Sequence, residues 1–328
     1  MYKRNILLLI FCCNIIIVNS QTTNKYDVVD RYVKNYSLKI INKEGLDRLI
    51  DTINKKFFHD IDKVRAAFYW ITENIGYNDN AATNKDYQYN NLDALLQTGK
   101  ALCGGYANLI EYFCRGFEVE CVTINGTGRS LYSDIILNPE SLSINHSWNA
   151  VKLDGVWRLL DATWGSGYTN YKTGEYHKSR NENYFLADPQ TFIYNHLPQK
   201  PEWQLLNGLV SATRFCDWPY IDEGYFTNQI FKVYPFQLYI DRKVGDTVQF
   251  KFFTNKQLSH IALESPDSKL IERGRLSVNS NFYSYTYRTT RNGEFDLRVS
   301  LFYLDEGRHT GYVTYTPTLI YRLRVNPK

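Results

Sequence analysis

The chain has 328 residues, of which 44% are hydrophobic and 16% aromatic, and these proportions exclude a disordered protein. Its 27 Tyr and 18 Phe favour β-rich packing. With 38 Lys and Arg against 34 Asp and Glu, the charge is close to balanced, which excludes the basic footprint of a nucleic-acid-binding protein. We therefore expect no nucleic-acid partner, and a chain long enough for two domains.

Residues 1–20 have the pattern of a secretory signal peptide. Lys3 and Arg4 precede an apolar run from Ile6 to Val18, and the small residues before the expected cut end at Ser20. The run is too short to cross a bilayer comfortably, although an anchor that is never cut is the alternative. Cleavage leaves 36 Lys and Arg against 34 Asp and Glu, and no later stretch suits a membrane span. We expect a soluble mature protein that is secreted or periplasmic.

Two helices follow at the start of the mature chain. Residues 21–60 are expected to form a helical support region, and a second helix is expected to begin at Asp60, which would cap it. The apolar stripes at helical spacing are Leu46, Leu49, Ile50 and Ile53 in the first, and Val64, Phe68, Ile71 and Ile75 in the second. The polar, aperiodic stretch over 78–91 is expected to be a surface loop.

The stretch GKALCGGYANLIEYFCRGF predicts a turn at Gly99 and a helix from about Cys103 to Arg115, ended by Gly116. At a helix N-terminus, free amide donors and the helix dipole favour a thiolate. The amide of Cys103 could also donate to a developing oxyanion. A buried structural cysteine is the alternative interpretation of the same residue.

The stretch NHSWNAVKLDGVWRLLDATW predicts a β-hairpin with its turn at Asp154-Gly155. Counting outward from the turn gives the side chains of one face: His146, Trp148, Asp161 and Thr163. His146 and Asp161 are then diagonal neighbours, about 7–8 Å apart at the backbone. A carboxylate there can fix one tautomer of the imidazole and stabilise its charged form. Alternatively, His146 caps a strand and Asp161 bonds within a turn.

The remaining cysteines and histidines give weaker signals. After cleavage four cysteines remain, which could form two bridges or leave one functional thiol: Cys103, Cys114, Cys121 and Cys216. The pairing among the last three stays open. His196 lacks a carboxylate at useful spacing and is expected to be structural. No metal-ligand pattern is present, so we expect neither a metal nor another cofactor.

Alternating segments such as TVQFKFF and FDLRVSLFY predict a small antiparallel β-sandwich near the end of the chain. The domain boundary, where this alternating pattern begins, lies between Leu206 and Phe231. We therefore expect a catalytic domain over residues 61–215 and an all-β, immunoglobulin-like domain over 216–328.

The motifs CGGYA, HSWNAV and LLDATWG together resemble the transglutaminase-like superfamily, over about residues 35–210. Within it, the segment YFLADPQTFIYNHLPQKPEWQLL resembles the kyphoscoliosis-peptidase group. The resemblance implies an α+β, papain-like core in which a helix bearing the cysteine packs against an antiparallel sheet. It also implies that Cys103 is the nucleophile, that His146 is the base and later the acid, and that Asp161 orients His146.

Such a site would transfer the acyl group of a protein or peptide amide through a thioester, to water as in a peptidase or to an amine as in a transglutaminase. The alternative is a catalytically silent secreted binding or scaffold protein. The sequence does not identify the substrate, the acceptor, a second oxyanion donor or the oligomeric state.

Overall fold

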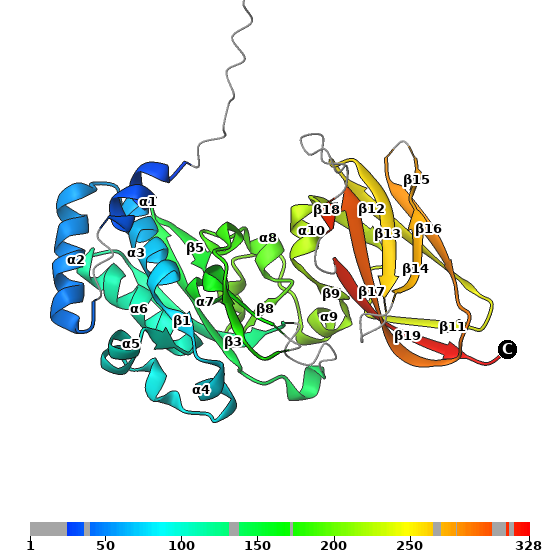
Figure 1. Cartoon of the computed structure of the whole chain (residues 1–328), viewed down its shortest axis with the longest axis horizontal. Helices are drawn as coiled ribbons and strands as arrows, with labels where there is room; N and C mark the ends of the chain where they lie inside the picture. Colours follow the sequence, from blue (N-terminus) through cyan, green and yellow to red (C-terminus); the bar gives the residue numbers. More distant parts are fainter. Residues whose placement is uncertain are drawn as a thin grey trace, which may run out of the picture.

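The computed structural model describes residues 25–35, 40–130, 138–170, 173–264, 270–279, 281–303, 313–314 and 318–328. The predicted signal peptide over 1–20 lies outside these residues. Figure 1 shows two lobes, one with most of the helices and a four-stranded sheet, and one made mainly of strands. Within the described residues, no helix has both the length and the apolar character needed to cross a membrane.

The first three helices share one hydrophobic core with the cysteine-bearing helix. They are α1 (Asp27–Lys34), α2 (Lys43–Lys56) and α3 (Asp60–Asn74). The predicted stripe of α2 is confirmed, since its four apolar residues are all buried. The predicted N-cap of α3 is wrong: His59 precedes the helix without a side-chain cap bond, and Asp60 is the first helical residue.

The stretch predicted as a loop contains two short helices. These are α4 (Asp79–Thr83) and η1 (Tyr87–Asn90), followed by α5 (Leu92–Thr98). The side chains of Asn78, Asp86 and Asn91 each accept a hydrogen bond from the first turn that follows them. These caps form helices that have no apolar stripe, which is why periodicity did not predict them. The predicted turn at Gly99 is confirmed by its left-handed backbone, with φ of 67°.

Helix α6 (Cys103–Gly116) packs against β3 and β4 of the antiparallel sheet of the first lobe. The sheet order is β5 (Val156–Leu160), β4 (His146–Leu153), β3 (Cys121–Gly128), β8 (His196–Pro198). Gly116 does not stop the helix as predicted but is its last residue, with Phe117 as the C-cap. A Cβ at Gly116 would lie 2.6 Å from the Ile50 side chain, so this glycine lets α2 approach α6.

Short elements complete the first lobe around this sheet. They are β1 (Gly76–Tyr77), β2 (Lys100–Ala101), η2 (Pro139–Ser141), α7 (Ala162–Ser166), β6 (Gly167–Thr169), β7 (Tyr176–Lys178), η3 (Glu182–Tyr184), α8 (Pro189–Phe192), η4 (Pro201–Gln204) and α9 (Ala212–Asp217). Strand β2 lies just before Cys103, pairs in parallel with β1 and leads the chain into α6.

The second lobe is a sandwich of two sheets, and α10 (Glu223–Thr227) lies between its first strand and β10. One sheet has the order β10 (Ile230–Tyr234), β12 (Thr247–Thr254), β16 (Tyr283–Arg288), β15 (Ser277–Val278). The other has the order β11 (Tyr239–Lys243), β19 (Leu319–Asn326), β17 (Gly293–Tyr303), β13 (Leu258–Glu264), β14 (Leu270–Arg275), with β9 (Tyr220–Ile221) and β18 (Val313–Thr314) at its side.

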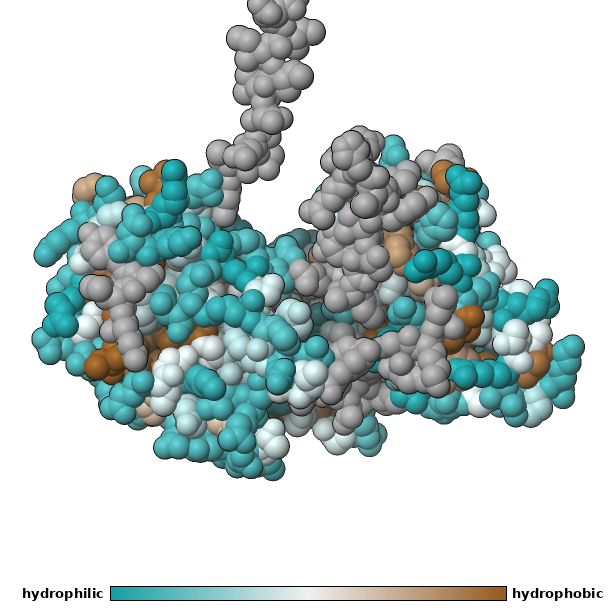
Figure 2. Space-filling model, viewed as in Figure 1, coloured by the Kyte–Doolittle hydropathy of each residue, from teal (hydrophilic) through white to brown (hydrophobic). Residues whose placement is uncertain are grey.

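The alternation that predicted this sandwich is visible in its core. Val248, Phe250 and Phe252 of β12 are buried against apolar side chains of the opposite sheet. The expectation of a wholly antiparallel sandwich is wrong, because β11 pairs with β19 in parallel. The α+β fold class with a β-rich C-terminal part is confirmed. Figure 2 shows a largely hydrophilic face with hydrophobic residues only in small groups, as expected when the apolar side chains fill internal cores.

Candidate active site

Cys103 is half-buried at the first position of α6. Leu102 occupies the N-cap without a side-chain bond, and the Asn90 side chain accepts instead from the amide of Gly105 at 2.9 Å. A Cβ at Gly105 would lie 2.4 Å from the carbonyl oxygen of Tyr89, so the glycine permits this close approach. Asn90, which lies outside the helix, therefore fixes the start of α6. The helix dipole at this end favours a thiolate.

His146 is the first residue of β4 and is buried against β3. It pairs with Gly126, while a Cβ at Gly128 would lie 2.8 Å from the Cβ of His146. The glycines of β3 therefore leave room for the imidazole and for the ring of Trp148 beside it.

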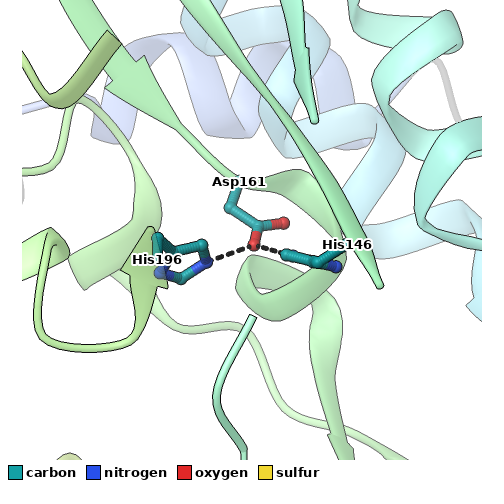
Figure 3. Close-up of side chains that lie close together, drawn as sticks. All are labelled: His146, Asp161 and His196. Carbon is teal, nitrogen blue, oxygen red and sulfur yellow. Dashed lines mark hydrogen bonds and ion pairs between the residues drawn. The ribbon is translucent and has the colours of Figure 1, made fainter. Parts of the chain in front are cut away.

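Asp161 is fully buried at the point where β5 ends and α7 begins. Its Oδ1 accepts from the backbone amides of Thr163 at 2.8 Å and Trp164 at 3.0 Å, which makes it the N-cap of α7. Its Oδ2 lies 2.7 Å from Nε2 of His146. Figure 3 shows the two side chains pointing toward one another.

The predicted hairpin is confirmed in register but not in length. Leu153 faces Val156, and the ladder continues to Asn149 opposite Leu160. The prediction that Asp161 and Thr163 extend the strand is wrong, because the chain turns into α7 at this point. Capping fixes the carboxylate more firmly than a strand position would, since one oxygen is bound by two amides and the other faces His146.

The electrostatics of the pair favour a charged imidazole. Burial alone would lower the pKa of His146, but the charge and hydrogen bond of Asp161, together with Cys103, raise it to about 10. Burial alone would raise the pKa of Asp161, but the charge of His146 and its hydrogen bonds hold it well below its usual range. At neutral pH the two groups therefore form a buried ion pair.

The thiol of Cys103 is coupled to the same pair. Burial acts to raise its pKa, but the hydrogen bond and charge of His146, with the backbone amide of Ser147, bring the pKa below its ordinary value. Since Nε2 of His146 faces Asp161, Nδ1 is the ring nitrogen left for Cys103. The structure thus brings the three predicted residues together, while their catalytic roles stay predictions.

His196 is a member of this group that the sequence analysis missed. Its Nε2 lies 3.0 Å from Oδ2 of Asp161, so the expectation that it has no partner carboxylate is wrong. Strand β8 pairs with β3 and places His196 opposite Gly128. The contact joins residues 35 positions apart, because the pairing of β8 with β3 brings His196 next to the hairpin. No local sequence pattern indicates such a contact.

Aromatic rings surround the two imidazoles. Trp164 stacks on His146 at 5.1 Å between ring centroids, and Phe192 stacks on His196 at 3.8 Å. His146, Asp161 and His196 also have metal-ligand atom types within 4.8 Å of one another. Both imidazoles meet Asp161 at hydrogen-bond distance, so we interpret the group as a hydrogen-bonded network. The expectation of no metal stays a prediction.

The other three cysteines lie away from this network. The four cysteines among the described residues are all free thiols. The hydrogen bond that the Cys114 thiol makes with Cys121, more than burial, raises the pKa of Cys114 well above its ordinary value. The structure contains neither of the two bridges that four cysteines could form among the described residues, and Cys114 and Cys121 are neighbouring thiols.

Comparison with known proteins finds a matching family for part of the first lobe. A family model described as the transglutaminase-like superfamily matches residues 47–162. The human kyphoscoliosis peptidase is 34% identical over 208 residues, which cover 61% of this chain and 30% of that protein. The Lim and transglutaminase domain protein ltd-1 from Caenorhabditis elegans is 29% identical over 210 residues, covering 61% of this chain and 28% of that protein.

The chain thus spans less than a third of the length of these two relatives. A solved structure of a TGase aligns with 49% of this chain and 42% of its own, at 22% identity and a TM-score of 0.26, which is too low to add to the argument. The resemblance predicted from the motifs is confirmed. Residues 47–162 belong to the transglutaminase-like superfamily, and the chain is a relative of the kyphoscoliosis peptidases.

Proposed function

We propose that the chain is a cysteine-dependent acyl-transfer enzyme that acts on protein or peptide amides. The observation that carries the proposal is the contact of 2.7 Å between Oδ2 of buried Asp161 and Nε2 of His146. Asp161 acts to raise the pKa of the imidazole, which is about 10, and the imidazole lowers the pKa of the Cys103 thiol. This is the electrostatic arrangement that activates a thiol nucleophile near neutral pH.

In the proposed reaction, the Cys103 thiolate attacks the carbonyl carbon of the amide. His146 gives its proton to the leaving amine as the C–N bond breaks, and a thioester remains. Water or a second amine, deprotonated by His146, then attacks the thioester carbonyl. The C–S bond breaks, which releases the carboxylic acid or the new amide and restores the Cys103 thiolate beside protonated His146. Asp161 supports both steps by stabilising the imidazolium and fixing its orientation.

The start of α6 can stabilise the oxyanion of the tetrahedral intermediate. The amide of Gly105 is used by Asn90, but those of Cys103 and Gly104 have no hydrogen-bond acceptor within the described residues. Amide donors at a helix N-terminus suit a developing negative charge. We propose the Cys103 amide as one donor, as the sequence analysis expected.

We also propose that the protein acts after export, with the signal-like pattern of residues 1–20 as support. The second lobe would then help to hold a protein substrate. N-terminal sequencing of the protein from the extracytoplasmic fraction tests export: a start after Ser20 supports it, and an intact first residue would contradict it.

The rate of iodoacetamide labelling at each cysteine, measured against pH by peptide mass spectrometry, tests the enzyme proposal. Cys103 should label fastest, with an apparent pKa well below the roughly 8.5 of a free thiol. Cys121 is likewise half-buried and serves as an internal control for exposure.

His146→Ala should remove the advantage of Cys103 and leave the labelling of Cys121 unchanged. If Cys103 titrates like Cys121 in the unaltered protein, the enzyme proposal fails. The binding or scaffold function then takes its place, because a scaffold does not require a thiolate.

A further inference from the structure

His196 is a buried imidazole that the mechanism above leaves unused. It is 1% exposed, and its Nε2 faces the same oxygen of Asp161 that His146 faces. Figure 3 shows Oδ2 between the two rings. With two amides on Oδ1, the carboxylate of Asp161 has four hydrogen-bond contacts in all.

The surroundings of His196 favour its neutral form. Burial, more than any other influence, lowers its pKa to about 4. The rings of Phe192, Trp164, Trp148 and Tyr184 enclose it, and the charged groups that face it are Asp161 and His146. A neutral imidazole can donate to a carboxylate only from the nitrogen that carries its proton.

The geometry identifies that nitrogen as Nε2. Nδ1 of His196 has no hydrogen-bond partner within the described residues, although the backbone of Phe192 acts to raise the pKa of His196. The Asp161 carboxylate is the stronger acceptor because it is charged.

We propose that His196 is a positioning residue for acyl transfer, whose neutral imidazole donates to Oδ2 of Asp161 and shares that oxygen with His146. The inference rests on the proposed function and extends it. His196 touches neither the thiol nor the substrate, and it acts only through Asp161.

His196 matters at the step in which His146 releases its proton. When His146 protonates the leaving amine, it becomes neutral, and Asp161 is left as a buried carboxylate without a cationic partner. Such a charge is costly unless several donors bind it. The donor from His196 lowers that cost, so His146 can release its proton more easily than with Asp161 alone.

Nitrogen-15 NMR of the histidine side chains tests the proposal, in a Cys103→Ser background where the thiolate no longer contributes to the pKa of His146. We expect His196 to stay neutral from pH 5 to 8, with its proton on Nε2. A proton on Nδ1, or titration of His196 near its ordinary pKa of about 6.5, would overturn the proposal.

Two substitutions test the effect on His146. His196→Phe keeps a ring against Phe192 but removes the donor, and it should raise the pKa of His146 by about one unit, as expected for the loss of one hydrogen bond to a charged group. His196→Gln keeps an amide donor near the position of Nε2 and should leave that pKa within a few tenths of a unit.

If folded His196→Phe leaves the pKa of His146 unchanged, the proposal is wrong. If His196→Phe fails to fold, the tautomer and titration of His196 in the parent, read by NMR, still decide the question. Iodoacetamide labelling of the chain with Cys103 intact separates this result from the proposed function. An unreactive Cys103 refutes the enzyme, whereas a reactive Cys103 with an unchanged His146 refutes only the role of His196.

Discussion

At the scale of single residues, Asp161 has both a structural role and a role at the candidate active site. The same carboxylate caps α7 through Oδ1 and faces two imidazoles through Oδ2, so its position is fixed from two directions. The folding of the β5–α7 junction therefore places the group that polarises His146.

Replacing this charge should change both reactivity and stability. Asp161→Asn lowers the pKa of His146, so the Cys103 thiolate loses its cationic partner and iodoacetamide labelling at pH 7 should fall at least about tenfold. Removing one partner of a buried ion pair also costs ~3 kcal/mol or more of the free energy of unfolding. Asp93→Asn, which breaks the exposed pair with Lys43, should change neither quantity measurably.

The pH dependence of unfolding has a defined direction. The pKa of His146 is raised to about 10, so its contribution is full below the unfolded value of 6.5 and is lost as the pH rises toward 10. The pKa of Asp161 is lowered, so its contribution is present above the unfolded value of 3.8 and is lost as the pH falls below it. Urea unfolding should therefore show the greatest stability between about pH 4 and 6.5, with smaller slopes on both sides in Asp161→Asn; equal slopes would contradict this account.

Gly128 gives a test of the packing around His146. A Cβ there would lie 2.8 Å from the Cβ of His146, and neither atom can rotate away. Gly128→Ala should displace the imidazole and slow Cys103 labelling about tenfold, while circular dichroism shows a folded protein. Gly208→Ala, where nothing lies within 4 Å of the added Cβ, is the matched control. Unchanged labelling in Gly128→Ala would show that the sheet shifts without moving the ring.

The sequence predicted three of the four residues of this network and missed the fourth. Cys103 is marked by a helix start, and His146 and Asp161 are marked by one hairpin whose turn sets their register. His196 is brought in by the pairing of β8 with β3, a long-range contact with no turn or spacing of its own. Local patterns therefore identify contacts within one hairpin, but not contacts with a more distant strand such as β8.

At the scale of elements, α1 is fixed to the lobe by a buried cation. Arg65 of α3 is fully buried and donates to both oxygens of Asp30, at 2.7 Å and 2.6 Å. The same guanidinium donates to Glu182 of η3. Two carboxylates from distant parts of the chain therefore stabilise one charge in the interior.

Breaking this contact should detach the first helix. Asp30→Ala leaves Arg65 without one of its two carboxylates and should lower the free energy of unfolding by about 3 kcal/mol. Glu44→Ala, which breaks the exposed pair with Arg48, should cost less than about 0.5 kcal/mol. Hydrogen exchange of α1 should accelerate only in Asp30→Ala; equal protection in both variants would show that apolar contacts alone hold the helix.

Helices were predictable where burial imposes a stripe. The apolar residues of α2 and α3 recur with the helical period because one face packs into the core. The short helices α4 and η1 depend on capping by Asn78 and Asp86, and the polar sequence between them resembles a loop. The parallel pairing of β11 with β19 was not predictable, because alternation gives the period of a strand and not its partner or direction.

At the scale of the whole molecule, a small apolar cluster connects the two lobes. It contains Ile193 and Leu197 from around β8 and Phe215, Cys216 and Trp218 from α9 and the residues after it. Phe236, between β10 and β11, packs against both this cluster and the core of the sandwich. The residues after α9 then enter the second lobe, because β9 pairs with β19.

Arg129 binds this connecting segment to the four-stranded sheet of the first lobe. It follows β3 and is fully buried, and its guanidinium donates to the carbonyl of Trp218 at 2.9 Å, with longer contacts to those of Phe215 and Pro219. Burial lowers the pKa of Arg129 to about 10, so the side chain remains charged at neutral pH.

Arg129→Ala should therefore loosen the connection between the lobes. We expect a loss of about 3 kcal/mol, from the lost hydrogen bonds and the cavity, and a Tm lower by several degrees. Arg158→Ala, at an exposed position on β5, should stay within about 0.5 kcal/mol of the parent. Limited trypsin digestion should give a new cut after Arg214 in Arg129→Ala alone, because local opening exposes the segment that the guanidinium holds. An unchanged digestion pattern with a lower Tm would show that Arg129 stabilises the first lobe and does not hold the two lobes together.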